Sequence, residues 1–179
     1  MFNLANILTL SRILAVPVIV LLLAFPGKTN CLIAMLAFIA ASLTDLADGL
    51  IARKYNLVTN LGKFLDPIAD KILITSVLIM LVERGWVPGW VAILIVVREI
   101  VVTGLRAIAA DKGMVIAADR YGKLKTIAQI VALCPIILHY SWWGINLVPL
   151  GMVILYVALA LTLFSGWNYL SNFYKVWTD

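Results

Sequence analysis

Charged residues are scarce in this chain. Only 13% of its 179 residues are Asp, Glu, Lys or Arg, whereas 64% are hydrophobic and the mean hydropathy is +1.05. A typical soluble domain carries about 25% charged residues, because a polar surface must cover its core. A chain of this length cannot hide so large an apolar fraction inside one core. The composition therefore excludes an ordinary soluble domain and predicts a membrane protein.

Cysteine and histidine are scarcer still. The chain has two cysteines, Cys31 and Cys134, and one histidine. The thiols stand alone in apolar stretches and show neither the spacing of zinc ligands nor that of a disulfide framework. We expect both to be packing residues, and they carry no information about the redox compartment.

Six apolar runs follow one another along the chain, separated by turn residues or polar segments. They cover about residues 6–25, 30–55, 60–83, 90–110, 127–139 and 146–170. A helix of about 20 such residues crosses a bilayer, so the pattern predicts an all-α protein with six transmembrane helices. No internal repeat, low-complexity segment or linker interrupts the series, which predicts a single domain over residues 1–179.

Basic residues are distributed unequally between the two ends of these predicted helices. With six spans, both termini fall on the more basic side, which the positive-inside rule assigns to the cytoplasm. That side holds Arg53, Lys54, Lys63, Lys112, Arg120, Lys123 and Lys175. The opposite loops hold little more than Lys28 and Arg84. The net charge of +5 thus reflects orientation and anionic headgroups, and we expect no nucleic acid partner.

Four aspartates interrupt the apolar sequence between residues 45 and 70. On a helix with about 100° per residue, one face would carry two carboxylates beside two small residues that permit close approach. These are Asp45, Asp48, Gly49 and Ala52. A second helix would repeat the pattern at i, i+4 and i+8 with Gly62, Asp66 and Asp70. A bare carboxylate in such surroundings costs several kcal/mol, so something must balance these charges.

A divalent metal is one way to balance the four carboxylates. Oxygen ligands without Cys or His favour Mg²⁺ or Mn²⁺ over zinc. The alternative is structural: Asp45 and Asp48 would cap a helix, while Asp66 and Asp70 would pair with neighbouring cations. Those cations would be Arg53, Lys63 and Lys71. This alternative leaves the placement of the glycines and the alanine unexplained.

The spacing of this stretch resembles the signature of the CDP-alcohol phosphotransferase family. Every fixed position of that signature is filled, by Asp45, Asp48, Gly49, Ala52, Arg53, Gly62, Asp66 and Asp70. The resemblance implies an integral membrane enzyme in which an alcohol displaces CMP from a CDP-linked lipid. It also implies divalent metal held by these aspartates, and two ions would neutralise the charge that gathers on the diphosphate.

Roles within the signature follow from this resemblance. Asp45, Asp48 and Asp66 are the expected metal ligands. Asp70 is similar to the proposed base of the family and would both ligate metal and take the proton of the attacking hydroxyl. The expected nucleotide and diphosphate site consists of Gly49, Ala52, Arg53 and Gly62. The start of the first helix resembles the polar entry of the family and would add Asn6 and Thr9, with Arg12 nearby. The open alternative is that these three residues cap the helix and reach the headgroups.

The fourth run carries Arg98 and Glu99 near mid-span, where charges are usually functional. Adjacent helical residues face about 100° apart, so we expect these two side chains to have different partners. A packing role for Glu99, in which it balances an arginine of a neighbouring helix, is the alternative. Together with basic residues of the following segment, Arg98 would clamp a dianionic phosphate on the acceptor. The set is Arg98, Arg106, Arg120, Lys123 and Lys125, although positive-inside topology alone also explains such residues.

Beyond the signature, two stretches resemble the bacterial phosphatidylglycerophosphate synthase branch of the family. They are Val97–Val101 with Leu105 and Arg106, and Gly122–Thr126 with Gln129. The branch implies CDP-diacylglycerol and glycerol-3-phosphate as substrates, membrane phospholipids as surroundings and the bacterial cytoplasmic membrane as location. It is also compatible with a homodimer. Inositol phosphate or phosphatidylglycerol are rival acceptors, and a divalent-cation transporter is the rival from another class.

Overall fold

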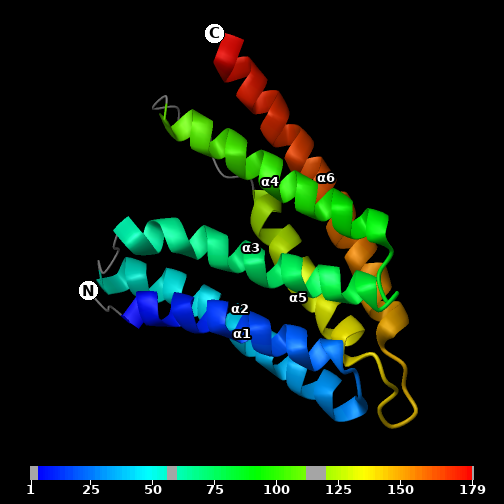
Figure 1. Cartoon of the computed structure of the whole chain (residues 1–179). Helices are drawn as coiled ribbons and strands as arrows, with labels where there is room; N and C mark the ends of the chain where they lie inside the picture. Colours follow the sequence, from blue (N-terminus) through cyan, green and yellow to red (C-terminus); the bar gives the residue numbers. More distant parts are fainter. Residues whose placement is uncertain (1–3, 56–59, 112–119, 179) are drawn as a thin grey trace.

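Six α-helices make up the molecule in the part that the structure describes (Figure 1). The structure is a computed structural model that describes residues 4–55, 60–111 and 120–178, and within these ranges it contains no strand. The helices are α1 (Leu4–Ala24), α2 (Lys28–Tyr55), α3 (Asn60–Glu83), α4 (Gly89–Asp111), α5 (Arg120–Leu138) and α6 (Val148–Thr178). The all-α prediction is confirmed.

Local sequence signals explain where the helices end. α3 closes in a Schellman motif, in which Gly85 N donates to Val82 O at 2.9 Å and Trp86 N donates to Leu81 O at 2.8 Å. Gly85 adopts a φ of +69°, which glycine reaches without a steric penalty. At the start of α6, the side-chain oxygen of Asn146 accepts a hydrogen bond from Val148 N at 3.0 Å and satisfies an amide that the helix leaves open.

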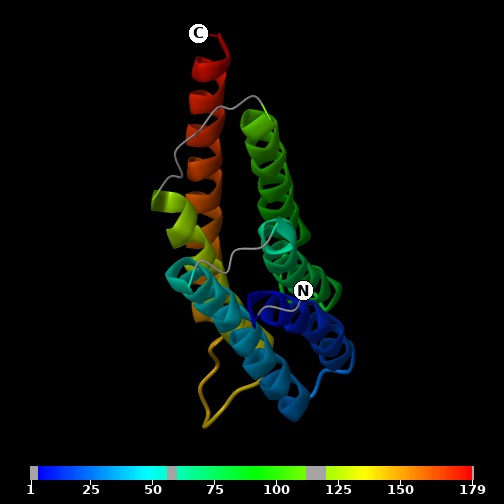
Figure 2. The same ribbon diagram turned by 90° about the vertical axis from the view of Figure 1, so that its left-hand side faces the viewer.

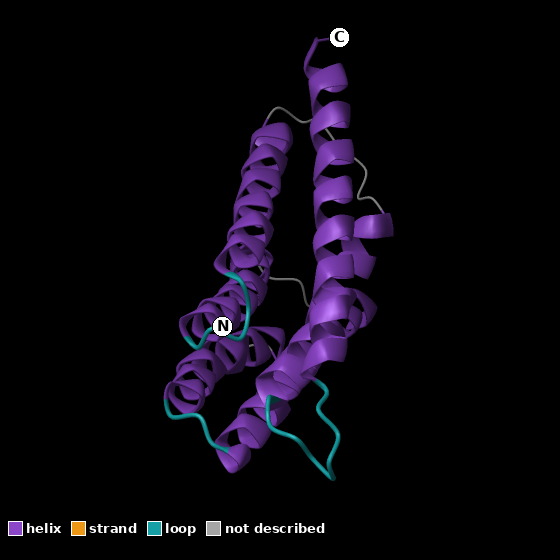
Figure 3. Cartoon of the chain, turned by 90° about the vertical axis from the view of Figure 1, so that its right-hand side faces the viewer, coloured by secondary structure: helices purple, strands orange, loops and turns teal. Residues whose placement is uncertain are grey.

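The helices run in alternating directions, so the described connections gather at one end. In Figure 1 the loops 25–27, 84–88 and 139–147 lie at the lower right, and both termini lie away from them. The 90° view of Figure 2 and the secondary-structure view of Figure 3 show the same long helices, with the 139–147 loop at the bottom. α1 packs against α2 and α3, α5 packs against α2 and α6, and α4 packs against α6.

The core consists mainly of aliphatic residues, together with Phe38 and Met80, and all six helices contribute to it. Its largest fully buried apolar side chains are Ile19, Leu23, Phe38, Leu73, Leu78, Leu81, Ile95, Leu133, Ile136, Ile137 and Leu155. Large apolar side chains also cover the outer faces of the same helices. Examples are Leu14, Leu21, Leu36, Ile79, Ile93, Ile100, Ile127, Val131, Leu150 and Val153. An apolar exterior of this extent is typical of a surface that contacts something other than water.

Apolar segments are found on several of the helices. Among the described residues, Val148–Ser171 of α6 is long and apolar enough to cross a membrane, with a mean hydropathy of 2.2 over its most apolar window. The parts Leu10–Ala24, Lys28–Thr44 and Leu124–Leu138 of three other helices are apolar as well.

α5 and α6 lie close together at Gly151. A Cβ atom at this position would lie 2.7 Å from Ile136 Cγ1, 2.8 Å from Pro135 Cγ and 2.9 Å from the carbonyl oxygen of Ala132. Two of these neighbours are a proline ring and a backbone atom, which have little freedom to move. The absent side chain therefore sets the spacing of the two helices.

Gly151→Ala is expected to lower the thermal midpoint of the purified protein in detergent. Overpacking a close contact typically costs about 1–3 kcal/mol, which exceeds the helix propensity of about 1 kcal/mol gained by replacing glycine. Gly104→Ala in α4 is the matched control, because nothing lies within 4 Å of its added Cβ. A midpoint for Gly151→Ala at or above that of the control would contradict this packing.

Candidate active site

The signature occupies the end of α2 and the beginning of α3. Asp45, Asp48, Gly49, Ala52 and Arg53 are helical residues of α2, and Gly62, Asp66 and Asp70 are helical residues of α3. The two helices contact each other, and both of these ends lie on the left-hand side of Figure 1. The side chains of the signature residues are outside the described part of the structure, so their ligand roles remain predictions.

The donor chemistry of the signature fits a divalent metal. Both helical segments supply carboxylate oxygens and neither supplies Cys or His, which suits a hard cation such as Mg²⁺ or Mn²⁺. Among the side chains that the structure describes, no three His, Cys, Asp or Glu residues gather closely enough to hold an ion. The described part of the chain thus offers no competing metal centre.

A polar cluster lies between four helices and begins one residue beyond the signature. We use this name for Lys71 of α3, Arg98, Glu99 and Thr103 of α4, Lys125 of α5 and Ser165 of α6. Glu99 Oε1 accepts hydrogen bonds from Lys125 Nζ and from Arg98 Nη1, the latter at 3.1 Å. The Lys125 and Arg98 side chains are only 7% and 9% exposed, and that of Glu99 is 22% exposed. Two buried cations therefore share one carboxylate.

The cluster also connects α3 to α4 and α4 to α6. Lys71 Nζ donates to Thr103 Oγ1, which in turn donates to the carbonyl oxygen of Glu99 at 2.6 Å. Arg98 Nη2 donates to Ser165 Oγ at 2.9 Å. The neighbouring Gly166 provides the space for this contact, because a Cβ there would lie 3.0 Å from Arg98 Cγ. One turn deeper, Gln129 Nε2 donates to Thr162 Oγ1 at 3.1 Å.

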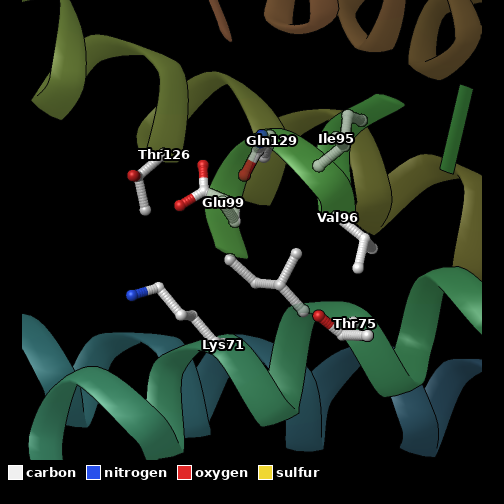
Figure 4. A pocket seen from close by; sticks show the side chains of 8 residues that line it. Lys71, Thr75, Ile95, Val96, Glu99, Thr126 and Gln129 are labelled. Carbon is white, nitrogen blue, oxygen red and sulfur yellow. The ribbon is translucent and has the colours of Figure 1, made fainter. Parts of the chain in front are cut away.

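A small cavity adjoins the cluster. It is lined by Lys71, Ile74, Thr75, Ile95, Val96, Glu99, Thr126 and Gln129. Figure 4 shows Lys71 and Thr75 of α3 facing Glu99 of α4 and Thr126 of α5 across this space. The space open to the centre of a water molecule is about 20 Å³, which is room for about one water.

The predicted acceptor residues divide into three groups in the structure. Arg98 and Lys125 meet at Glu99, as described. Arg106 lies apart from them on an exposed part of α4, with its guanidinium carbon 5.8 Å from the centre of the Tyr169 ring. Arg120 and Lys123 belong to the first turn of α5, and their side chains are outside the described part.

Two expectations about buried charges need correction. Arg98 and Glu99 have different partners on other helices, Ser165 and Lys125, as the sequence predicts, but they also bond to each other, which it does not predict. The flexible arginine side chain bridges the 100° between their helical directions, which the argument from Cα positions neglected. The alternative expected an arginine of a neighbouring helix opposite Glu99, whereas the cation of a neighbouring helix that bonds to Glu99 is Lys125.

Arg12 is the second correction. Neither headgroups nor a helix cap account for it, because it is only 1% exposed and its Nε donates to the carbonyl oxygen of Ala41 at 3.2 Å. Arg12 therefore ties α1 to α2 shortly before the signature begins. Asn6 and Thr9 lie on the first turns of α1, and their side chains are outside the described part.

Aromatic contacts hold the opposite end of the bundle together. The rings of Trp86 and His139 stack at 3.7 Å between centroids with 6° between their planes, and Lys28 Nζ lies 4.6 Å from the centre of a Trp142 ring. Burial lowers the pKa of His139, so its ring is neutral at neutral pH. The stabilising contribution of the neutral ring is present above about pH 6.5 and is lost as the pH falls through the lowered folded-state pKa.

The helical fold, with the acidic signature on α2 and α3, agrees with the class of protein that the sequence resembles, an all-α CDP-alcohol phosphotransferase. The model of the CDP-alcohol phosphatidyltransferase family matches residues 2–164, and the chain belongs to this family. The family resemblance predicted from the eight signature residues is thereby confirmed.

Curated relatives cover almost the whole chain. A Bacillus subtilis protein named CDP-diacylglycerol–glycerol-3-phosphate 3-phosphatidyltransferase is 44% identical over 184 residues, covering 96% of this chain and 95% of the relative. A Rickettsia typhi protein of the same name is 43% identical and covers 94% of this chain and 96% of its own length. A Mycobacterium tuberculosis protein named probable phosphatidylglycerophosphate synthase is 43% identical, with 95% and 81% covered.

Proposed function

We infer that this chain transfers the phosphatidyl group of CDP-diacylglycerol to sn-glycerol-3-phosphate, giving phosphatidylglycerophosphate and CMP. The observation that carries this inference is the match to relatives of that name at 43–44% identity over nearly their full length. The reaction is a step in anionic phospholipid biosynthesis. It agrees with the branch resemblance of the stretches around Arg98 and Lys125.

The setting we propose is the bacterial cytoplasmic membrane. All six helices would span it as one domain over residues 1–179, with both termini and the signature on the cytoplasmic side. The apolar outer faces, the candidate span in α6 and the placement of both termini away from the three described loops support this topology. Two copies could associate laterally as a homodimer in the membrane.

For the metal we propose Mg²⁺ or Mn²⁺, as two ions, at Asp45, Asp48, Asp66 and Asp70. When bound, the ions would neutralise the diphosphate and stabilise CMP as the leaving group. The support is the all-oxygen donor set on two helices that contact each other.

The remaining roles belong to side chains of this chain. Gly49, Ala52 and Gly62 would leave room for the nucleotide, while Arg53 would donate hydrogen bonds to the diphosphate. Asn6 and Thr9 would contact the nucleotide from α1. Asp70 would take the proton from the acceptor hydroxyl as that hydroxyl attacks the lipid-side phosphorus.

The acceptor would be recognised through its phosphate. A dianionic phosphate on a small polyol is bound most strongly by charge-assisted hydrogen bonds from basic side chains. The proposed donors are Arg98, Arg106, Arg120, Lys123 and Lys125. The described pair at Glu99 brings two of these cations together from α4 and α5.

Release of CMP from CDP-diacylglycerol by the purified protein tests the function. With divalent metal present, we expect release to depend on glycerol-3-phosphate and to yield phosphatidylglycerophosphate. Parallel reactions with inositol phosphate, with phosphatidylglycerol and without acceptor serve as controls. Faster release with either rival acceptor would reassign the substrate, and no release with any acceptor would refute the transferase reaction.

A further inference from the structure

Glu99 is the carboxylate at which two cations of the polar cluster meet. Its Oε1 atom accepts hydrogen bonds from Arg98 Nη1 and Lys125 Nζ, and the side chains of these two cations are only 9% and 7% exposed. Charged groups buried in this way inside an apolar bundle are costly and usually have a function.

The geometry at Glu99 favours a shared anion. Arg98 and Lys125 come from different helices but donate to the same atom, Glu99 Oε1. The shared acceptor keeps the two cationic groups close to each other. A lysine ammonium carries three N–H donors, and Glu99 engages one of those of Lys125. A phosphate, with several terminal oxygens, can bridge two cations at such a separation.

The backbone of Glu99 is fixed relative to the signature. Its carbonyl oxygen accepts from Thr103 Oγ1, and that hydroxyl accepts from Lys71, the residue that follows Asp70 on α3. Glu99 is thus tied through its backbone to the signature helix and through its carboxylate to α5. A displacement of Glu99 would move both cations together relative to α3.

We propose that Glu99 is a positioning residue for the acceptor phosphate. Its carboxylate holds the Lys125 ammonium and the Arg98 guanidinium in place inside the bundle, so that they can bind the phosphate of the acceptor. This proposal rests on the proposed function and extends it, because it assigns a role to an acidic residue that does not contact the substrate.

Steady-state kinetics with each substrate varied in turn tests the proposal. Glu99→Gln should raise the KM for glycerol-3-phosphate by about 10-fold, the loss expected for one charged hydrogen bond, and change the KM for CDP-diacylglycerol by less than about twofold. Glu99→Asp keeps the charge on a shorter side chain and should give a smaller rise. Glu83→Gln is the matched control. It makes the same chemical change at the last residue of α3, at the end of that helix away from the signature, and should leave both KM values unchanged.

A double variant tests whether Glu99 acts through Lys125. In Lys125→Gln the lysine that Glu99 holds is already absent, so adding Glu99→Gln can disturb only Arg98. The double variant should therefore have a KM for glycerol-3-phosphate that is only slightly higher than that of Lys125→Gln. Multiplication of the two single effects would overturn the positioning role, because independent residues give additive free energies.

Thermal midpoints measured beside the kinetics separate positioning from simple stabilisation. An unchanged KM for glycerol-3-phosphate in Glu99→Asp, together with a lower midpoint, would overturn the proposal and leave Glu99 a packing residue. The KM and the thermal midpoint of Glu99→Asp are sufficient for this test even if Glu99→Gln does not fold. If the wild type itself released no CMP with glycerol-3-phosphate, the proposed function would fail instead, and the two failures are therefore distinguishable.

Discussion

Asp48→Asn and Asp66→Asn are each expected to abolish CMP release while leaving a folded, membrane-inserted protein. Each change removes a charged metal ligand, so both the occupancy of the ions and the neutralisation of the diphosphate are lost. Stabilisation of several kcal/mol then disappears from the transition state, which corresponds to a rate loss on the order of 10³-fold or more. Turnover and Mn²⁺ binding should be measured on the same preparations.

Asp111→Asn is the matched control for these two variants. Asp111 is the last residue of α4 and lies outside the signature, so the same loss of one carboxylate should leave turnover and Mn²⁺ binding unchanged. Near wild-type activity of either signature variant at ordinary metal concentration would refute the metal assignment. Equal losses in all three variants would point to a general effect of charge on the fold.

The helices could be predicted from the sequence because their boundaries depend on local chemistry. The run predicted over about residues 60–83 is α3 from Asn60 to Glu83, and it ends where Gly85 takes up a left-handed conformation that other residues avoid. The last helix was predicted to end near Leu170 but continues to Thr178. Its polar and aromatic tail has no apolar periodicity, although nothing in it breaks a helix.

The partners of the charged residues could not be predicted in the same way. The pairing of Glu99 with Lys125 joins residues 26 positions apart, and the bond from Arg98 to Ser165 spans 67 positions. Such contacts depend on how α4, α5 and α6 pack, which no local pattern specifies. The sequence showed only that Glu99 is a charged residue in the middle of an apolar run. This position indicated a functional residue but did not identify its partner.

The roles of the signature residues were predicted from a family resemblance, and no described side chain tests them. The backbone places its residues on the two helices that the spacing implied, α2 and α3. The convergence of the carboxylates on metal ions remains a prediction. The aspartate whose role is least determined by ligand chemistry alone is Asp70, because a metal ligand and a general base make different demands on the same group.

Asp70→Asn should lower kcat by at least about 10²-fold while CDP-diacylglycerol and one metal ion still bind. A general base contributes about 10²–10⁴-fold, and an amide cannot take the proton of the attacking hydroxyl. The other three aspartates should retain an ion and the donor lipid. Asp70→Glu, which keeps a carboxylate on a longer side chain, is the conservative variant and should recover part of the lost rate.

Turnover across a metal titration, with donor binding measured directly, separates the two roles of Asp70. If Asp70 is a base, kcat of Asp70→Asn stays low at saturating metal, because added ions cannot replace a proton acceptor. If Asp70 is a ligand only, the metal concentration for half-maximal rate rises and kcat recovers toward the wild-type value at high metal. A bound ion weakens a carboxylate as a base but also acidifies a hydroxyl that it contacts, so a plateau between these limits would measure how much proton transfer still depends on the side chain.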